Sequence, residues 1–389
     1  MRKFIKNYFI VLIFLIVISI FFTDSCFCQK KLPFEVHAKS AILLDGVSGQ
    51  VIYEYNPNLR TGPASLTKIV ALDIVFDNIK EGNIKLEDEV IISEKAWRTY
   101  GSKMFIEVGK KVKVEDLIKG VAVISGNDAC VALAEHISGV EEVFVNKMNE
   151  KIKSIGLINT KFNNSSGLPH PEQYTVALDM AFITWHHLKD HPEALVYYKM
   201  KEFKFNNIKQ SNRNGLLWRD NTVDGLKTGH IESAGFHLIA TAKRGIQRFI
   251  AVVLGEKDEF TRENDAYRLL EYGFKNFATV SLIRKENSMK VVKIWKGKIN
   301  QLALWAEEEG IVTVPKESAK NLTIKENIPK IIYAPIKSGE PVGEMVIYEN
   351  DKPIKKIHLI AGRDVERAGF LRCLWHSIII FIKSLFSWN

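Results

Sequence analysis

The sequence has 389 residues, of which 46% are hydrophobic and 25% charged, and a formal charge of +9. A chain of this length suits two or three domains, and the composition excludes a disordered chain or a protein with many membrane spans. The positive charge indicates either an anionic partner or a basic solvated surface.

The N-terminus has the layout of a secretory signal. Three basic residues within the first six precede an apolar run over residues 8–22, and a polar, small-residue stretch follows over 23–28. This order is typical of a signal peptide, and the run is short for a membrane span. We therefore expect residues 1–28 to be a signal peptide. An exported chain rarely meets nucleic acid, so anionic lipid or cell-wall polymer is the expected anionic neighbour.

The region after the signal begins with β-favouring runs and continues with helical patterns. Residues 40–44 and 50–55 flank the turn sequence Asp-Gly-Val-Ser-Gly and predict a hairpin. Apolar residues then recur at intervals of three and four, which predicts helices over residues 66–79, 114–124, 129–137 and 143–155.

Two further β-favouring runs, residues 236–242 and 249–254, predict a second hairpin, and a last helix is expected over 263–274. Strands at both ends with helices between them predict an α/β domain over residues 33–275. Its sheet would be built from the N- and C-terminal segments of the domain.

The C-terminal third has a different texture. Beyond residue 276, short β-favouring runs recur about every ten residues between turn sequences, which predicts a small all-β domain over residues 276–363. In the tail, residues 364–389, a broad apolar face that includes Trp375 lies opposite Arg372 and His376. This pattern predicts an amphipathic helix lying in a lipid interface; the alternative is a helix docked on its own domain.

The cysteine and histidine residues do not have the spacing of a metal-binding motif. Two of the four cysteines lie in or beside the expected signal, and Cys130 and Cys373 lie in a predicted core helix and in the tail. No disulfide framework follows from this arrangement. Because the sequence has no CxxC, HExxH or Cys/His cluster, neither a metal nor another cofactor is expected.

The first chemical motif is Ser65-Leu66-Thr67-Lys68. Positions three apart share one face of a helix, so the Lys68 amine can approach the Ser65 hydroxyl. A serine hydroxyl is a weak nucleophile until a neighbouring base takes its proton. The preceding Gly62-Pro63 indicates that the helix begins there, with Ser65 in its first turn. Alone, the motif is weak, because a chain of this length contains it by chance.

Two further motifs follow. Ser125-Gly126-Asn127 lies between two predicted helices and could present a hydroxyl and an amide to a cleft, although an ordinary helix cap would read the same. Lys227-Thr228-Gly229 offers a cation and a hydroxyl to a carboxylate, and glycine lets a strand edge approach a ligand closely.

Together, in this order, the three motifs resemble the SxxK, S-D-N and K-T-G set of penicillin-binding proteins and class A β-lactamases. The middle motif, here Ser-Gly-Asn, is similar to that of the low-molecular-mass serine D-alanyl-D-alanine carboxypeptidases (peptidase S11, penicillin-binding protein 5 and 6 type). Further similar segments are residues 63–69, 101–105, 125–129, 162–164 with 167–168, and 224–236. Ile231 departs from the threonine common in the family, which bears on specificity rather than on the reaction.

The resemblance implies the fold of serine β-lactamases and D,D-peptidases, and an acyl-enzyme mechanism. Ser65 would attack the penultimate D-alanine of a peptidoglycan stem peptide, the terminal D-alanine would leave, and water would hydrolyse the ester. Lys68 would be the general base, assisted by Ser125 and Asn127. The backbone N–H groups of Ser65 and His230 would form the oxyanion hole.

The resemblance also implies a binding site for the terminal carboxylate. Lys227, Thr228 and Gly229 would form it, with Arg213 and Arg262 as weaker candidates. β-Lactams would acylate the same serine as covalent inhibitors. The expected location is the periplasmic face of a bacterial inner membrane, with peripheral attachment through the C-terminal helix.

Three other functions remain open. A D,D-endopeptidase of cross-links would use the same residues. A β-lactamase would need a carboxylate to activate the deacylating water, and Glu172 lies in the right interval but lacks the nearby asparagine. A non-catalytic wall-binding scaffold would not need an intact nucleophile and base.

Overall fold

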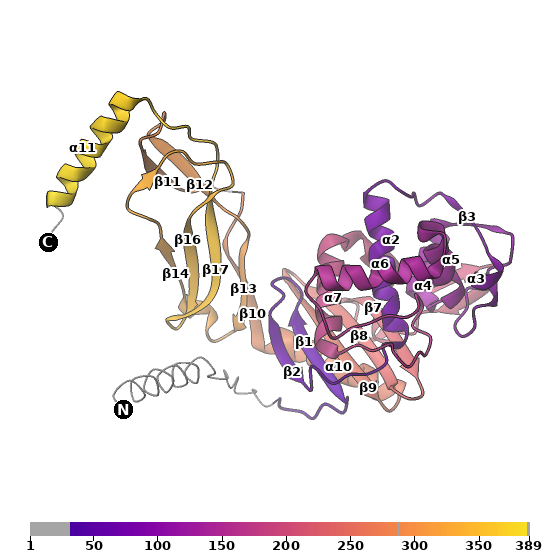
Figure 1. Cartoon of the computed structure of the whole chain (residues 1–389). Coiled ribbons are helices and arrows are strands. Elements are labelled where there is room, and N and C mark those ends of the chain that lie inside the picture. Colours follow the sequence, from indigo (N-terminus) through magenta and orange to yellow (C-terminus); the bar gives the residue numbers. More distant parts are fainter. Residues whose placement is uncertain (1–31, 287, 387–389) are drawn as a thin grey trace, which may run out of the picture. The chain divides into compact units, whose positions relative to one another are not determined.

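The computed structural model describes residues 32–286 and 288–386. A five-stranded antiparallel sheet in the order β2-β1-β9-β8-β7 organises the first part of the chain (Figure 1). Its strands are β1 (Ser40–Asp45), β2 (Val51–Tyr55), β7 (Val223–Ile231), β8 (Gly235–Arg244) and β9 (Gln247–Glu256). The sheet thus combines N- and C-terminal segments, and both predicted hairpins are present.

Helices pack on this sheet and on one another. The longer ones are α2 (Lys68–Lys80), α4 (Val114–Ile124), α5 (Asn127–Ser138), α6 (Glu141–Ser154), α7 (Ala177–Asp190) and α10 (Glu259–Asn276). Shorter elements between them are η1 (Ala64–Thr67), β3 (Glu89–Ile91), α3 (Glu94–Arg98), β4 (Lys111–Lys113), η2 (Pro192–Ala194), α8 (Leu195–Tyr198), β5 (Glu202–Phe205), β6 (Ile208–Ser211) and α9 (Leu216–Arg219).

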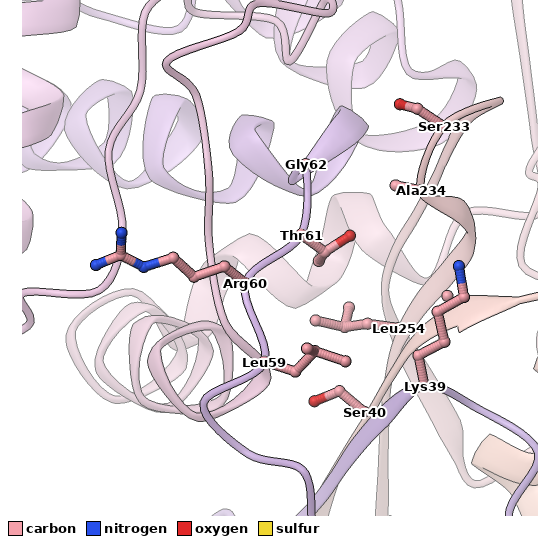
Figure 2. Close-up of a pocket in the computed structure, with 10 residues that line it drawn as sticks. Lys39, Ser40, Leu59, Arg60, Thr61, Gly62, Ser233, Ala234 and Leu254 are labelled. Carbon is pink, nitrogen blue, oxygen red and sulfur yellow. The ribbon is translucent and has the colours of Figure 1, made fainter.

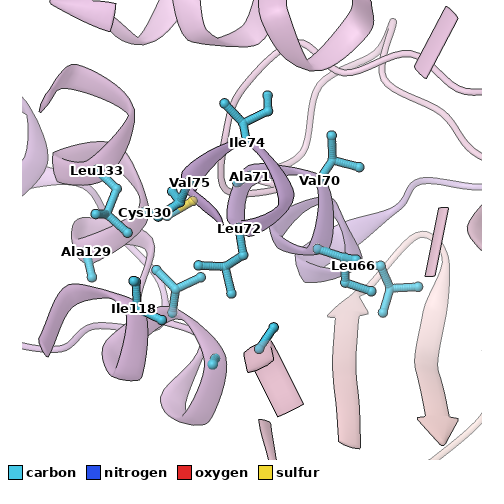
Figure 3. Packing of buried hydrophobic residues seen from close by; sticks show 14 of the residues in the cluster. Leu66, Val70, Ala71, Leu72, Ile74, Val75, Ile118, Ala129, Cys130 and Leu133 are labelled. Carbon is cyan, nitrogen blue, oxygen red and sulfur yellow. The ribbon is translucent and has the colours of Figure 1, made fainter. Parts of the chain in front are cut away.

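Helix α2 forms the centre of the hydrophobic core. Every residue from Lys68 to Phe76 is buried, and a helix that is apolar on most sides is stable only inside a domain. Its apolar side chains, with those of α4 and α5, belong to one cluster that includes Val75, Ile118 and Leu133 (Figure 3). The N-terminal end of α2, which carries Lys68, is therefore held on a rigid support.

The C-terminal part is a β-rich region followed by a helix. Its main sheet has the order β14-β16-β17-β12-β11-β15, and β10 pairs with β13. The elements are β10 (Phe277–Ile283), β11 (Ser288–Trp295), β12 (Gln301–Ala306), β13 (Gly310–Pro315), η3 (Ala319–Asn321), β14 (Leu322–Asn327), β15 (Ile332–Tyr333), β16 (Pro341–Glu349), β17 (Lys352–Ala361) and α11 (Phe370–Phe386).

The sequence missed several elements. Helix α10 begins four residues before the expected start, because the Asp258 side chain accepts a hydrogen bond from the Thr261 N–H (2.6 Å) and caps a polar first turn. Helix α7 and strands β10 and β12 were not expected. The predicted domain limits stay predictions, although β10 begins directly after α10 ends at Asn276. The predicted signal, residues 1–28, lies outside the described residues.

Candidate active site

The three motifs lie on or between elements that contact one another. Ser65 lies in the single 3₁₀ turn η1, and Lys68 is the first residue of α2, so the serine precedes the α-helix rather than lying in its first turn. Asn127 is the first residue of α5, and Lys227 lies in β7. The structure therefore brings a serine, an amide and two lysines to the place where α2, α5 and β7 meet.

The Lys68 amine has three oxygen neighbours. Its Nζ lies 2.9 Å from Ser65 Oγ and 2.7 Å from Asn127 Oδ1, and it also contacts the Ser166 carbonyl oxygen. The Asn127 Nδ2 donates to the Tyr100 carbonyl at 2.7 Å, which fixes the amide orientation and leaves Oδ1 towards Lys68. Two of the three neighbours can therefore only accept a hydrogen bond.

This geometry suits a neutral lysine. A neutral amine has two N–H donors and one lone pair, so the donors can serve Asn127 Oδ1 and the Ser166 carbonyl. The lone pair then faces Ser65 Oγ, which is the one neighbour able to donate. Burial lowers the pKa of Lys68 to about 8, and Arg213 acts in the same direction. Lys68 is thus placed and tuned to accept a proton from Ser65.

Ser125 ends α4 in a left-handed conformation, with φ 61° and ψ 31°. Its side chain is 2% exposed, and its hydroxyl has no hydrogen-bond partner among the described residues. An unsatisfied buried hydroxyl is costly and uncommon in native proteins. Such a group is available to a substrate or to a proton in transit.

Lys227 and Thr228 are both buried on β7. The Lys227 ammonium donates to the Thr228 carbonyl at 3.0 Å. Burial lowers the pKa of Lys227 well below its ordinary value, and the charges of Lys68, Arg213 and Arg262 add to this effect. A bound carboxylate would act in the opposite direction and favour the charged lysine.

The remaining predicted residues have mixed environments. His230 is exposed and its ring stacks on Phe236 at 4.0 Å. Arg213 is exposed, whereas Arg262 is buried. The Arg262 guanidinium donates to the Arg213 carbonyl at 3.2 Å and to the Glu263 carboxylate at 3.3 Å. Because Arg262 already has a carboxylate partner, it is a weaker candidate for a substrate carboxylate than Lys227.

The loop before α7 supplies parts of the site that sequence reasoning did not assign. The Ser166 carbonyl is a partner of Lys68, and a Cβ on Gly167 would lie 1.8 Å from the Ala64 carbonyl oxygen. Gly167 also has a φ of +82°, so only glycine fits. Asn164 Oδ1 accepts from the Gly167 N–H at 2.7 Å and holds the turn. The family-like sequence of this loop was the available signal.

Asp128 holds a second supporting segment. Its carboxylate accepts from the backbone N–H groups of Met104 (2.8 Å) and Phe105 (2.9 Å). A Cβ on Gly101, whose φ is +89°, would lie 2.7 Å from Asn127 Nδ2. The segment around residues 101–105 therefore packs directly on the amide that contacts Lys68.

Two hollows adjoin the segment before Ser65. One, of about 390 Å³, is lined by Gly62, Pro63, Pro169, His170, Pro171, Gln173, Ile231 and Ser233. The other, of about 270 Å³, has Thr61 and Gly62 on one side and Ser233 and Ala234 on the other (Figure 2). Within the described part of the chain, no group of three or more His, Cys, Asp or Glu side chains could hold a metal ion.

A serine and a lysine in contact, an asparagine on that lysine and a second lysine on the adjoining antiparallel sheet are typical of serine acyl-transfer enzymes. Together they indicate the D,D-peptidase and β-lactamase class. The family model described as D-alanyl-D-alanine carboxypeptidase (peptidase S11) matches residues 27–258. That of the penicillin-binding protein 5 C-terminal domain matches residues 277–367. The chain belongs to the S11 D-alanyl-D-alanine carboxypeptidase family.

Individual relatives agree. The chain is 40% identical to D-alanyl-D-alanine carboxypeptidase DacC of Escherichia coli, over 91% of this chain and 90% of that one. It is also 40% identical to DacA of Haemophilus influenzae, over 91% and 92%. The structure of penicillin-binding protein 5 from H. influenzae matches with a TM-score of 0.81 and 38% identity, over 87% and 100% of the two chains. The predicted family and fold class are confirmed.

Proposed function

We propose that Ser65 is the nucleophile and Lys68 the general base of a serine-type D-alanyl-D-alanine carboxypeptidase acting on peptidoglycan stem peptides. The contact that carries the proposal is Lys68 Nζ to Ser65 Oγ, at 2.9 Å, with acceptor-only oxygens around the rest of the amine. Lys68 takes the hydroxyl proton as Ser65 attacks the penultimate D-alanine carbonyl. The terminal D-alanine leaves, and water then cleaves the ester.

The other site residues have supporting roles. The free hydroxyl of Ser125 carries a proton to the departing amine, and Asn127 orients Lys68. The N–H groups of Ser65 and His230 bind the developing oxyanion, a role that is typically worth about 10²–10³ in rate for one donor. Lys227 and Thr228 bind the terminal carboxylate, and Gly229 lets β7 lie close to Ala64 and Ser65.

The inner part of the peptide would extend past Ile231. This residue follows His230 along β7 and lines the 390 Å³ hollow, which offers space for the inner part of the peptide. β-Lactams, which mimic the D-Ala-D-Ala end, would acylate Ser65. Penicillin-binding protein D2 of Listeria monocytogenes, 26% identical with a TM-score of 0.58, is known with ampicillin bound.

The structure bears on the alternatives. Glu172, the carboxylate considered for a β-lactamase, is exposed and paired with Lys161 at 2.7 Å, an arrangement that gives no support to a role in activating water. A scaffold would not require the buried Lys68 environment. Cleavage of cross-links uses the same groups and is the second activity to measure.

We also propose export and attachment to a membrane surface through α11. The polar side of α11 contacts the β-rich region: the Lys296 N–H donates to His376 Nδ1 at 2.8 Å, and Arg372 donates to Asn300 Oδ1 at 2.6 Å. The apolar side, including Leu371 and Trp375, is exposed. Within residues 32–286 and 288–386, no helix has the length and hydropathy needed to cross a bilayer.

Release of D-alanine from a peptide ending in D-Ala-D-Ala tests the proposed activity. Ser65→Ala should lower kcat at least about 10⁴-fold, because the covalent route is removed. Ser338→Ala, at an exposed serine in the β-rich region, should match the wild-type enzyme. A Ser65→Ala enzyme that still releases D-alanine would rule out the acyl-serine route, and faster cleavage of cross-linked dimers would favour the endopeptidase.

A further inference from the structure

The backbone that leads to Ser65 lies against the edge strand β7. A Cβ on Gly229 would come within 3.1 Å of Ala64 Cβ and 3.3 Å of the Ser65 backbone nitrogen. The two proposed oxyanion donors, the N–H groups of Ser65 and His230, therefore belong to two segments in van der Waals contact. Their spacing depends on how the segment from Gly62 to Ser65 is held.

His237 forms a hydrogen bond with the Gly62 carbonyl oxygen. It lies on β8 directly opposite Gly229 in the β7–β8 register, and it is fully buried. Its Nε2 is 3.0 Å from the Gly62 carbonyl oxygen, and its Nδ1 accepts from the Gly255 N–H at 2.9 Å. One imidazole ring thus joins β9 to the chain three residues before the nucleophile.

The two partners fix the protonation state of the ring. A backbone N–H can only donate, so Nδ1 must carry a lone pair; a carbonyl can only accept, so Nε2 must carry the hydrogen. Burial lowers the pKa of His237 to about 4, the bonds to Gly62 and Phe236 raise it, and the charges of His230 and Arg262 lower it. The ring is therefore neutral in the range where the enzyme would work.

The side chain of Ile231 packs directly against Gly62. A Cβ on Gly62 would lie 2.6 Å from Ile231 Cδ1. Gly62 also lines both hollows beside the site, one of which Figure 2 shows. Because Gly62 faces these hollows, two contacts restrain the segment from Gly62 to Ser65. They are the hydrogen bond from His237 on β8 and the apolar contact from Ile231 on β7.

We propose that His237 is a positioning residue for the reaction: through the Nε2–H to Gly62 bond it sets the position of the Ser65 backbone N–H relative to β7. This inference rests on the proposed acyl-serine mechanism. His237 touches neither substrate nor the reacting atoms, and it acts on the rate through the geometry of the oxyanion donors.

Two substitutions separate the two bonds of the ring. In His237→Asn, the side-chain oxygen can replace Nδ1 and keep the Gly255 bond, but nothing reaches Gly62. In His237→Gln, the side-chain nitrogen lies where Nε2 was and can keep the Gly62 bond. We expect kcat for D-alanine release and the rate of Ser65 acylation by benzylpenicillin to fall about tenfold or more in His237→Asn, with KM changed less than about threefold.

The same rates should recover to within about threefold of wild type in His237→Gln, although both variants lose one buried hydrogen bond. Thermal unfolding of each variant separates a change in rate from a loss of folded protein. His358→Asn, at an exposed histidine of β17, is the matched control. Equal rates in the Asn and Gln variants, or losses that follow only the melting temperature, would overturn the role of His237. A wild-type enzyme that is not acylated at Ser65 would overturn the mechanism beneath it.

Discussion

The protonation state of the Lys68 amine determines whether it can act as a base toward Ser65. An ammonium group would donate to all three of its oxygen neighbours and leave the Ser65 hydroxyl without a base. A neutral amine satisfies the Asn127 and Ser166 oxygens and still presents its lone pair to Ser65. Complete burial makes the neutral form accessible by lowering the pKa of Lys68 to about 8.

This lowered pKa predicts the pH dependence of acylation. The neutral fraction of Lys68 grows as pH rises, so the second-order rate constant for acylation by nitrocefin should rise about tenfold per pH unit below 7 and level off above about 8. Stopped-flow measurements between pH 6 and 9.5 test this. Lys68→Arg, which keeps a cation but cannot act as a base, should lose about 10²–10⁴ in rate at every pH. A flat profile would contradict the role of Lys68 as base.

At the residue scale, the sequence singled out candidate side chains, three of which the structure brings into contact, but it gave no indication of the backbone groups beside them. Ser65, Lys68 and Asn127 were identified because their residue types and order carry the chemistry. The Ser166 carbonyl and the Gly62 carbonyl have no sequence signature, since every residue has a carbonyl. Only the path of the folded loop brings one of them to Lys68 and the other to His237.

At the scale of elements, apolar periodicity predicted the limits of α2, α4, α5 and α6 to within two residues but missed α7. Helix α4 has the predicted limits, Val114–Ile124. The Gly62-Pro63 sequence predicted that Ser65 lies in the first turn of an α-helix, whereas η1 is a separate 3₁₀ turn in which Ala64 has a φ of +48°. Contact with Gly167 and Gly229, from distant parts of the chain, shapes this turn, so local pattern could not reveal it.

Helix α11 gives a prediction at the same scale. Its exposed apolar side should bind anionic phospholipid vesicles, because its polar side is already occupied by the β-rich region. Trp375→Asp combined with Phe381→Asp should weaken vesicle co-sedimentation about tenfold or more, since each aromatic side chain would lose its burial in the interface.

The matched control for this test is Phe260→Asp, at a comparably exposed aromatic residue at the start of α10. It should bind vesicles as the wild-type chain does. Equal binding by the α11 variant and the control would contradict membrane attachment through α11, and would leave its exposed apolar side for another occupant.

At the scale of the whole molecule, the catalytic sheet and the β-rich region are joined by more than the chain. Thr313 of β13 donates to buried Asp45 of β1 at 2.8 Å, and its hydroxyl also lies 2.7 Å from that of Thr279 in β10. The length of the chain, and the change from helical periodicity to short β-favouring runs, predicted a catalytic region followed by an all-β one. Contacts of this kind could not be predicted, because they join residues more than 260 positions apart with no shared pattern.

The proposed mechanism requires an acyl-enzyme on Ser65. The most direct test is to incubate the purified protein with benzylpenicillin and locate the modification by peptide mass spectrometry. We expect one penicilloyl group per chain, on the peptide that contains Ser65, and none in Ser65→Ala. An adduct on another residue, or a folded protein that neither binds penicillin covalently nor hydrolyses it, would rule out an acyl-enzyme on Ser65.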